Sequence, residues 1–231
     1  MNVIVIAPHP DDEILGCGGT IAAHCAAGDH VTVVLLTRGN PAIFPADLIA
    51  RTREEFRQVH SMLGVREQVL LDFLAPGLED VPVYVVADQL RQIIQKARPQ
   101  VVYTPFGGDL HSDHKVAYTA TLVATRPLGG VSVGRVLCYE TLSETEWGDV
   151  LTQNAFVPNV FHDIKEHLET KLTAMACYKS QLREAPHPRN LEVIRMLAGV
   201  RGAVCGLHAA EAFSLVREVV SGDRRSETGN A

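Results

Sequence analysis

The chain has 231 residues, of which 46% are hydrophobic, and its formal net charge at pH 7 is −6. This length and apolar content predict a folded globular protein with a large core. The acidic balance and the scattered Lys and Arg residues exclude the basic footprint that is typical of nucleic-acid binding. A neutral or small polar molecule is therefore the expected partner.

Five cysteines lie far apart in the sequence, and none forms a C-x-x-C pair. An odd number at such spacing fits neither a disulfide framework nor a zinc finger, so we expect buried thiols in a reducing compartment. The N-terminus lacks a signal-peptide pattern, and no stretch approaches the roughly 20 apolar residues of a membrane helix. The sequence thus predicts a cytoplasmic protein without a membrane partner.

Short apolar runs rich in β-branched residues alternate with segments of helical periodicity. In chain order, the runs predict strands at 2–7, 30–37, 68–72, 100–105 and 133–140, and the periodic segments predict helices at 13–28, 47–64, 83–99 and 112–127. Such alternation is typical of a mainly parallel sheet with helices on both faces. We therefore expect a Rossmann-like, doubly wound α/β fold with strand order 3-2-1-4-5.

The C-terminal third adds elements to this domain. A short strand is expected at 159–164 and a helix at 165–181, with an apolar face toward the core. No repeat or flexible linker interrupts the chain, so residues 1–220 are predicted to form a single domain. Residues 221–231 are small and polar, and we expect them to form a disordered tail.

Three acids, Asp11, Asp12 and Glu13, follow the first predicted strand after the Pro-His-Pro segment at 8–10. Capping of a helix N-terminus explains such acids in most proteins, but it does not account for His9. The glycines at 16–19 raise the alternative of a nucleotide site. The G-x-G-x-x-G spacing is absent, however, and the acids occupy the place of a pyrophosphate, so close helix packing explains these glycines better.

A second polar loop follows the fourth predicted strand, at 105–114. In the expected strand order the first and fourth strands are neighbours, and ligands bind at the carboxyl ends of such strands. This loop and the loop at 8–13 should therefore meet, although each alone could be a polar turn, with Ser112 or Asp113 as a cap. Crowded carboxylates repel one another unless a cation offsets them, and imidazole beside carboxylate suits zinc. The sequence predicts a metal site at this edge.

The pairing of H-P-D-D-E at 9–13 with H-S-D-H at 111–114 resembles the LmbE/PIG-L family of zinc-dependent N-deacetylases. The likeness covers most of the chain, including A-A-E-A-F at 209–213. It implies a metal ion held by His9, Asp12 and His114, with Zn²⁺ as the expected ion and Fe²⁺ as the alternative.

The resemblance also implies roles for the neighbouring side chains. Asp11 would be the general base, His111 would stabilise the oxyanion, and Asp113 would orient His111. His111 or the protonated Asp11 would then deliver a proton to the leaving amine. Asp11 keeps the alternative of a helix N-cap, Glu13 is expected to be structural, and the role of Asp109 stays open between holding the loop and orienting a ligand histidine.

Arg53 resembles an arginine that lines the substrate pocket in the family, although the match could fall on Arg51. Arg38 follows the second predicted strand and points toward the same crevice. Alternatively, the helix arginines are solvated charges paired with Glu54 and Glu55.

The implied reaction is removal of an acetyl group from an N-acetylated amino sugar conjugate of the N-acetylglucosamine type. The chain departs from the family pattern at Asn40, Ser112 and His208, which leaves the substrate open. Cleavage of another acyl group, a non-catalytic nucleotide- or sugar-binding module with a structural metal, and a metal-free Rossmann-type domain are the alternatives. Relatives often form oligomers, so a homo-oligomer is also expected.

Overall fold

The structure is a computed structural model and describes residues 1–128, 132–149 and 155–220. Its strands are β1 (Asn2–Ala7), β2 (His30–Gly39), β3 (Glu67–Ala75), β4 (Val101–Pro105), β5 (Arg135–Tyr139), β6 (Val160–Asp163) and β7 (Ala210–Glu218). Its α-helices are α1 (Asp12–Ala26), α2 (Ala46–Leu63), α3 (Val83–Ala97), α4 (Ser112–Ala124), α5 (Leu168–Cys177) and α6 (Leu191–Cys205). Two short 3₁₀ turns, η1 (Leu78–Asp80) and η2 (Lys165–His167), complete the described elements.

One sheet organises the chain, in the order β3-β2-β1-β4-β5-β7-β6. The pairs from β3 to β5 are all parallel, whereas β7 runs antiparallel to both β5 and β6. The predicted doubly wound order 3-2-1-4-5 is confirmed, and the two remaining strands extend the sheet at the β5 edge.

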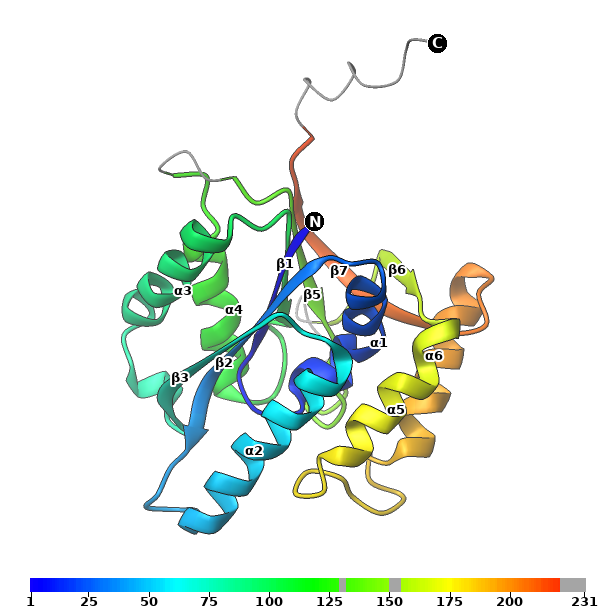
Figure 1. Cartoon of the computed structure of the whole chain (residues 1–231), viewed down its shortest axis with the longest axis horizontal. Coiled ribbons are helices and arrows are strands. Elements are labelled where there is room, and N and C mark those ends of the chain that lie inside the picture. The colour runs from blue at the N-terminus through cyan, green and yellow to red at the C-terminus, as the bar shows by residue number, and fades with distance from the viewer. Residues whose placement is uncertain (129–131, 150–154, 221–231) are drawn as a thin grey trace.

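The two faces of the sheet bury separate cores. Alternate residues of β1 show the division, because Val3 and Val5 belong to one apolar cluster and Ile4 and Ile6 to the other. The first cluster includes side chains of α1, α2, α5 and α6, and the second includes side chains of α3 and α4. Figure 1 shows these two helical layers on opposite sides of the sheet. Burial on both faces explains why the strands read as continuous apolar runs.

The glycines of α1 permit close packing, as predicted. A Cβ at Gly16 would lie 2.1 Å from Cδ2 of Tyr139, and a Cβ at Gly19 would lie 2.8 Å from Cγ2 of Ile164. The helix also breaks between them, because Cys17 has non-helical dihedral angles of φ −144° and ψ 24°.

A buried ion pair between side chains of β7 and α5 forms hydrogen bonds with the backbone groups at this break. Glu211 of β7 accepts hydrogen bonds from the backbone N–H groups of Gly19 and Thr20, at 2.9 and 2.7 Å. Lys171 of α5 donates to the carbonyl of Leu15 at 2.8 Å and to Glu211 at 2.6 Å. Both side chains are buried, so the pair replaces backbone hydrogen bonds that the break removes.

Several expectations for the C-terminal third need correction. The helix predicted at 165–181 is shorter, with η2 followed by α5, and neither α6 nor β7 was predicted. Of the thiols expected to be buried, Cys17 and Cys138 are buried, but Cys205 is exposed; all five cysteines are unpaired. The tail predicted at 221–231 lies outside the described residues.

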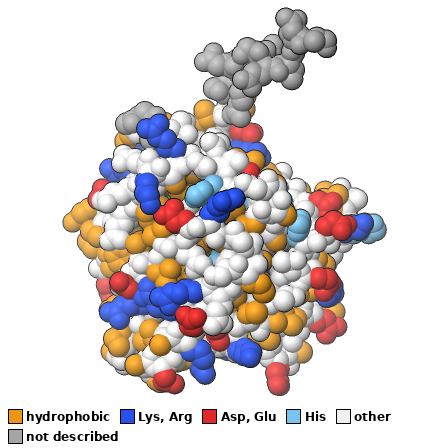
Figure 2. Space-filling model, in the orientation of Figure 1, with side chains coloured by type: hydrophobic (Ala, Val, Ile, Leu, Met, Phe, Trp, Pro, Cys, Tyr) orange, Lys and Arg blue, Asp and Glu red, His pale blue; other side chains and the backbone are white. Residues whose placement is uncertain are grey.

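Charged side chains of both signs are interspersed on the face that Figure 2 shows. Among the described helices, none combines the length and apolarity that crossing a membrane requires.

Candidate active site and metal centre

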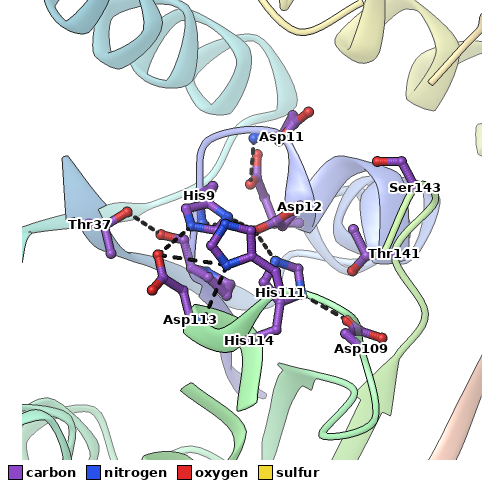
Figure 3. A network of polar contacts seen from close by, with 12 residues as sticks. His9, Asp11, Asp12, Thr37, Asp109, His111, Asp113, His114, Thr141 and Ser143 are labelled. Carbon is purple, nitrogen blue, oxygen red and sulfur yellow. Dashed lines mark hydrogen bonds and ion pairs between the residues drawn. The ribbon is translucent and has the colours of Figure 1, made fainter. Parts of the chain in front are cut away.

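The loops after β1 and β4 meet at one edge of the sheet, as their parallel pairing requires. Figure 3 shows the rings of His9, His111 and His114 gathered around two carboxylates, Asp12 and Asp113. His9, Asp12 and His114 each offer one ligand atom, and these three atoms lie within 4.8 Å of one another. These are the three residues expected to hold a metal ion, and the fold brings them together.

The hydrogen bonds of His114 leave one ring nitrogen prepared for a cation. Its Nδ1 lies 2.8 Å from Oδ2 of Asp109, which fixes the proton on Nδ1 and leaves a lone pair on Nε2. This Nε2 atom is buried, has no hydrogen-bond partner in the described part of the chain, and lies 3.2 Å from Oδ2 of Asp12. Two electron-rich atoms facing each other in a buried site fit a shared metal ion.

Asp12 and His9 are the other two residues of the three-residue cluster. Oδ2 of Asp12 accepts a hydrogen bond from the backbone N–H of His9 at 2.8 Å and lies 3.3 Å from its Nδ1. The other ring nitrogen of His9, Nε2, lies 2.9 Å from Oδ2 of Asp113. Two imidazoles and one carboxylate, each fixed by a further contact, form a donor set that suits zinc or Fe²⁺.

Asp113 contacts a different histidine from the one expected. Its carboxylate is shared between His9 and the backbone N–H of Leu78, each at 2.9 Å, whereas Nδ1 of His111 lies 3.9 Å away. The contact with His111 is made by the backbone instead, because the N–H of Asp113 donates to Nδ1 of His111 at 3.1 Å. An orienting role of the Asp113 carboxylate toward His111 stays a prediction.

That backbone hydrogen bond decides the tautomer of His111. A ring nitrogen that accepts a hydrogen bond carries no proton, so neutral His111 has its proton on Nε2. Burial, and then the charge of His9, lower the pKa of His111, which favours this neutral form. His111 lines the cavity beside the cluster, where it can offer an N–H donor.

Asp11 stands at the start of α1 in a strained conformation, with φ 111°. Its side chain makes no capping hydrogen bond, which argues against the N-cap alternative. Its Oδ2 lies 3.3 Å from Nη1 of Arg189, and the residue is only 2% exposed. Burial, followed by repulsion from Asp12, raises the pKa of Asp11 to about 7, while Arg189 and His9 oppose the shift.

Glu13 has the structural setting that was expected. It is fully buried and accepts hydrogen bonds from Tyr178 at 2.7 Å and from the backbone N–H of Asp11 at 3.3 Å. Burial raises the pKa of Glu13 to about 8.

A cavity of about 250 Å³ opens over the cluster. Its polar lining includes His9, Asp11, Asp12, Arg38, Arg53, His111, Ser143, Glu144, Gln181 and Arg189, and its apolar lining includes Leu15, Phe44, Leu48, Ile49, Pro76 and Leu142. Both arginines expected to bind substrate therefore lie on its wall.

Arg189 is a site residue that sequence reasoning missed. It lies between α5 and α6, and it also donates to Oγ of Ser143 at 2.9 Å and to Oε1 of Gln181 at 3.3 Å. No motif or periodicity marks this segment, so its proximity to Asp11 emerges only in the folded chain.

Comparison with known proteins shows which family the chain resembles. The profile described as "PIG-L: GlcNAc-PI de-N-acetylase" matches residues 4–125. The uncharacterized deacetylase YaiS of Escherichia coli is 31% identical over 191 residues, which span 78% of this chain and 91% of that protein. The diacetylchitobiose deacetylase of Thermococcus kodakarensis is 29% identical over 226 residues, spanning 93% of this chain and 83% of that enzyme.

A solved structure agrees. The conserved protein TT1542 from Thermus thermophilus superposes with a TM-score of 0.77 and 27% identity, covering 97% of this chain and 98% of that one. Sequence match, fold and the converging site loops lead to one conclusion: the chain belongs to the PIG-L family of de-N-acetylases.

Proposed function

We propose that this protein is a metal-dependent deacetylase that hydrolyses the acetamide of an N-acetylated amino sugar of the N-acetylglucosamine type. The observation that carries the proposal is that one cavity is lined by a buried carboxylate, a neutral imidazole and two members of the three-residue metal cluster. The similar enzyme of Thermococcus kodakarensis is a diacetylchitobiose deacetylase, which supports the sugar class.

His9, Asp12 and His114 would hold the metal ion, Zn²⁺ or alternatively Fe²⁺. Two neutral imidazoles and one carboxylate leave a divalent ion with net positive charge, and three protein ligands are typical of catalytic rather than structural zinc. When bound, the ion would polarise the acetamide carbonyl and lower the pKa of a water molecule.

The protein side chains would divide the proton transfers. Asp11 takes a proton from the attacking water as the water oxygen bonds to the carbonyl carbon, and a base with a pKa near 7 suits this step. The Nε2–H of His111 donates to the oxygen that gains negative charge. The C–N bond then breaks, the nitrogen takes the proton from Asp11, and the free amine leaves with acetic acid, which loses its remaining acidic proton to water to give acetate. Arg189, whose Nη1 lies 3.3 Å from Oδ2 of Asp11, would hold the Asp11 carboxylate in position.

We also propose a cytoplasmic setting, because all five cysteines are free thiols. The expected partner is a small sugar conjugate rather than nucleic acid or membrane, and a homo-oligomer stays a prediction.

The first test is the metal content of the purified protein by elemental mass spectrometry. We expect about one zinc or iron ion per chain, and its loss in His114→Ala. A panel of N-acetylated sugars should then release acetate. If the wild type binds no metal even after zinc is supplied, the proposal fails, and another carboxylic acid in place of acetate would refute the acetyl assignment.

The Asp11→Asn variant separates catalysis from binding. We expect it to retain the metal but to lose about 10²- to 10⁴-fold in kcat, because the base is gone while the three ligands remain. Unchanged turnover would contradict the role of Asp11. No turnover in either protein, with metal bound, would favour a binding module with a structural metal.

A further inference from the structure

Three arginines line the cavity, and two of them have a carboxylate partner. Arg189 lies 3.3 Å from Asp11, and Nη1 of Arg53 donates to Oδ1 of Asp72 at 2.6 Å. The guanidinium of Arg38, the third, makes no hydrogen bond or ion pair with another side chain or the backbone within the described ranges of the chain. Its positive charge helps to lower the pKa of Asp72, but the larger effect there comes from the hydrogen bond of Arg53.

Arg38 lies at the same edge of the sheet as the metal centre. It is the last residue but one of β2, and the preceding Thr37 donates from Oγ1 to the carbonyl of Pro8 at 2.7 Å. Pro8 directly precedes His9, so Thr37 appears beside the cluster in Figure 3. A group bound at Arg38 would therefore belong to a molecule that also reaches the cluster through the shared cavity.

The surroundings of Arg38 strengthen its attraction for an anion. Arg38 is half-buried, and the apolar residues Phe44, Leu48 and Ile49 line the same cavity. Beside such apolar side chains, water screens charge less than at an open surface. The planar guanidinium offers paired donors that match the geometry of a carboxylate or phosphate.

We propose that Arg38 forms a subsite for an anionic group, a carboxylate or a phosphate, on the moiety linked to the N-acetylated sugar. The inference rests on the proposed function, which places the acetamide at the metal cluster. It names the substrate as an acidic glycoconjugate rather than a neutral oligosaccharide.

Two glycosides that differ in charge test the subsite. The probes are the carboxymethyl and 2-hydroxyethyl α-glycosides of N-acetylglucosamine, with acetate release giving kcat/KM for each. We expect the wild-type protein to prefer the acid by roughly tenfold to a hundredfold, the range for one charge-assisted hydrogen-bonded pair. A second pair, N-acetylglucosamine 1-phosphate and its methyl α-glycoside, shows whether phosphate gives the larger ratio.

Variants assign the preference to Arg38. In Arg38→Met the ratio should fall close to one through a higher KM for the acid, and Arg38→Lys should keep part of it, because the charge stays while the paired donors are lost. Arg57→Met is the matched control, since Arg57 lies on α2, is 52% exposed in its side chain and does not line the cavity. The control should keep the wild-type ratio.

Equal kcat/KM values of the wild type for each pair would overturn the subsite and leave the deacetylase function standing. If no glycoside releases acetate, the proposed function fails, and calorimetric Kd values decide the subsite separately. Tighter binding of the acid by the wild type, lost in Arg38→Met, would support it. Equal Kd values of the charged and neutral glycosides would refute it.

Discussion

Asp109 shows how one buried side chain prepares another for a metal ion. It fixes Nδ1 of His114 with one oxygen, while the other accepts a hydrogen bond from Thr145 at 2.6 Å. Sequence reasoning left its role open, and the geometry favours the orientation of a ligand histidine. An acceptor at Nδ1 keeps the lone pair of His114 on Nε2, where the cation is expected.

We therefore expect Asp109→Ala to weaken metal binding by about 10- to 100-fold, as measured by competition with a chromophoric chelator. Asp109→Asn should lose less, because its amide oxygen still accepts from His114. Thr145→Val serves as the milder control, since it removes a contact to Asp109 but none to the ring. Equal affinity in all these proteins would show that Asp109 only holds the loop.

His60 makes stability depend on pH. It is fully buried on α2, Nδ1 lies 2.7 Å from the carbonyl of Phe56, and burial lowers its pKa from 6.5 to about 4. Between these pH values the unfolded chain binds a proton that the folded chain does not. Stability from His60 is therefore lost as the pH falls from about 6.5 to about 4, by roughly 3 kcal/mol in all.

Urea unfolding of the wild type and His60→Gln across this pH range measures the contribution. The difference in unfolding free energy between the two proteins should change in favour of the variant as the pH falls, and should level off below about pH 4. A constant difference would show that His60 titrates alike in both states.

At the scale of single residues, the meeting of the two loops could be predicted from the sequence, because they follow strands that are neighbours in the expected order. The choice of His9, Asp12 and His114 as metal ligands rests on the family resemblance and stays a prediction. The place of Arg189 could not be predicted, since it depends on the path between α5 and α6. The partner of the Asp113 carboxylate depends on ring orientations that no spacing encodes.

At the level of elements, Gly16 of α1 has a packing role, whereas Gly199 of α6 has none. Gly16 lies against Tyr139 and the carbonyl of Glu140, so a Cβ there would force the helix from the sheet. Gly199 of α6 has nothing within 4 Å of an added Cβ and no positive φ. The same residue type is thus required by packing in one helix and only costs helix propensity in the other.

Alanine substitutions should therefore change stability in opposite directions. Gly16→Ala is expected to destabilise by about 1–3 kcal/mol or more through overpacking, and Gly199→Ala to stabilise by about 0.5–1 kcal/mol. Midpoints of urea unfolding measure both effects. If Gly16→Ala left the midpoint unchanged, the close packing of α1 on the sheet would be wrong.

Two elements that were not predicted, β7 and α6, depart from the pattern of buried apolar and exposed polar residues on which the prediction relied. β7 carries Glu211 in the core, where Lys171 from a distant helix makes its burial tolerable. α6 exposes Met196, Val200 and Val204, which obscures the apolar face of an amphipathic helix. The parallel strands lacked such exceptions, and their order was predicted.

For the whole molecule, the position of β7 argues that residues 1–220 unfold as one unit. β7 returns from the C-terminal helices and pairs with β5, so the last described strand belongs to the same sheet as the first. Far-UV circular dichroism and absorbance of the buried Tyr103, Tyr139 and Tyr178 should give coincident urea transitions. Two separate transitions would contradict the single domain.

The convergence of two loops also bears on the order of events in folding. His9 and Asp113, in contact at the site, are 104 positions apart in the chain, and their loops meet only through the β1–β4 pairing. Such a contact closes a long loop of chain, so it forms late and slowly compared with local helices. A partly folded chain with intact helices would thus still lack the site, and the ability to capture a metal ion would report that the centre of the sheet has closed.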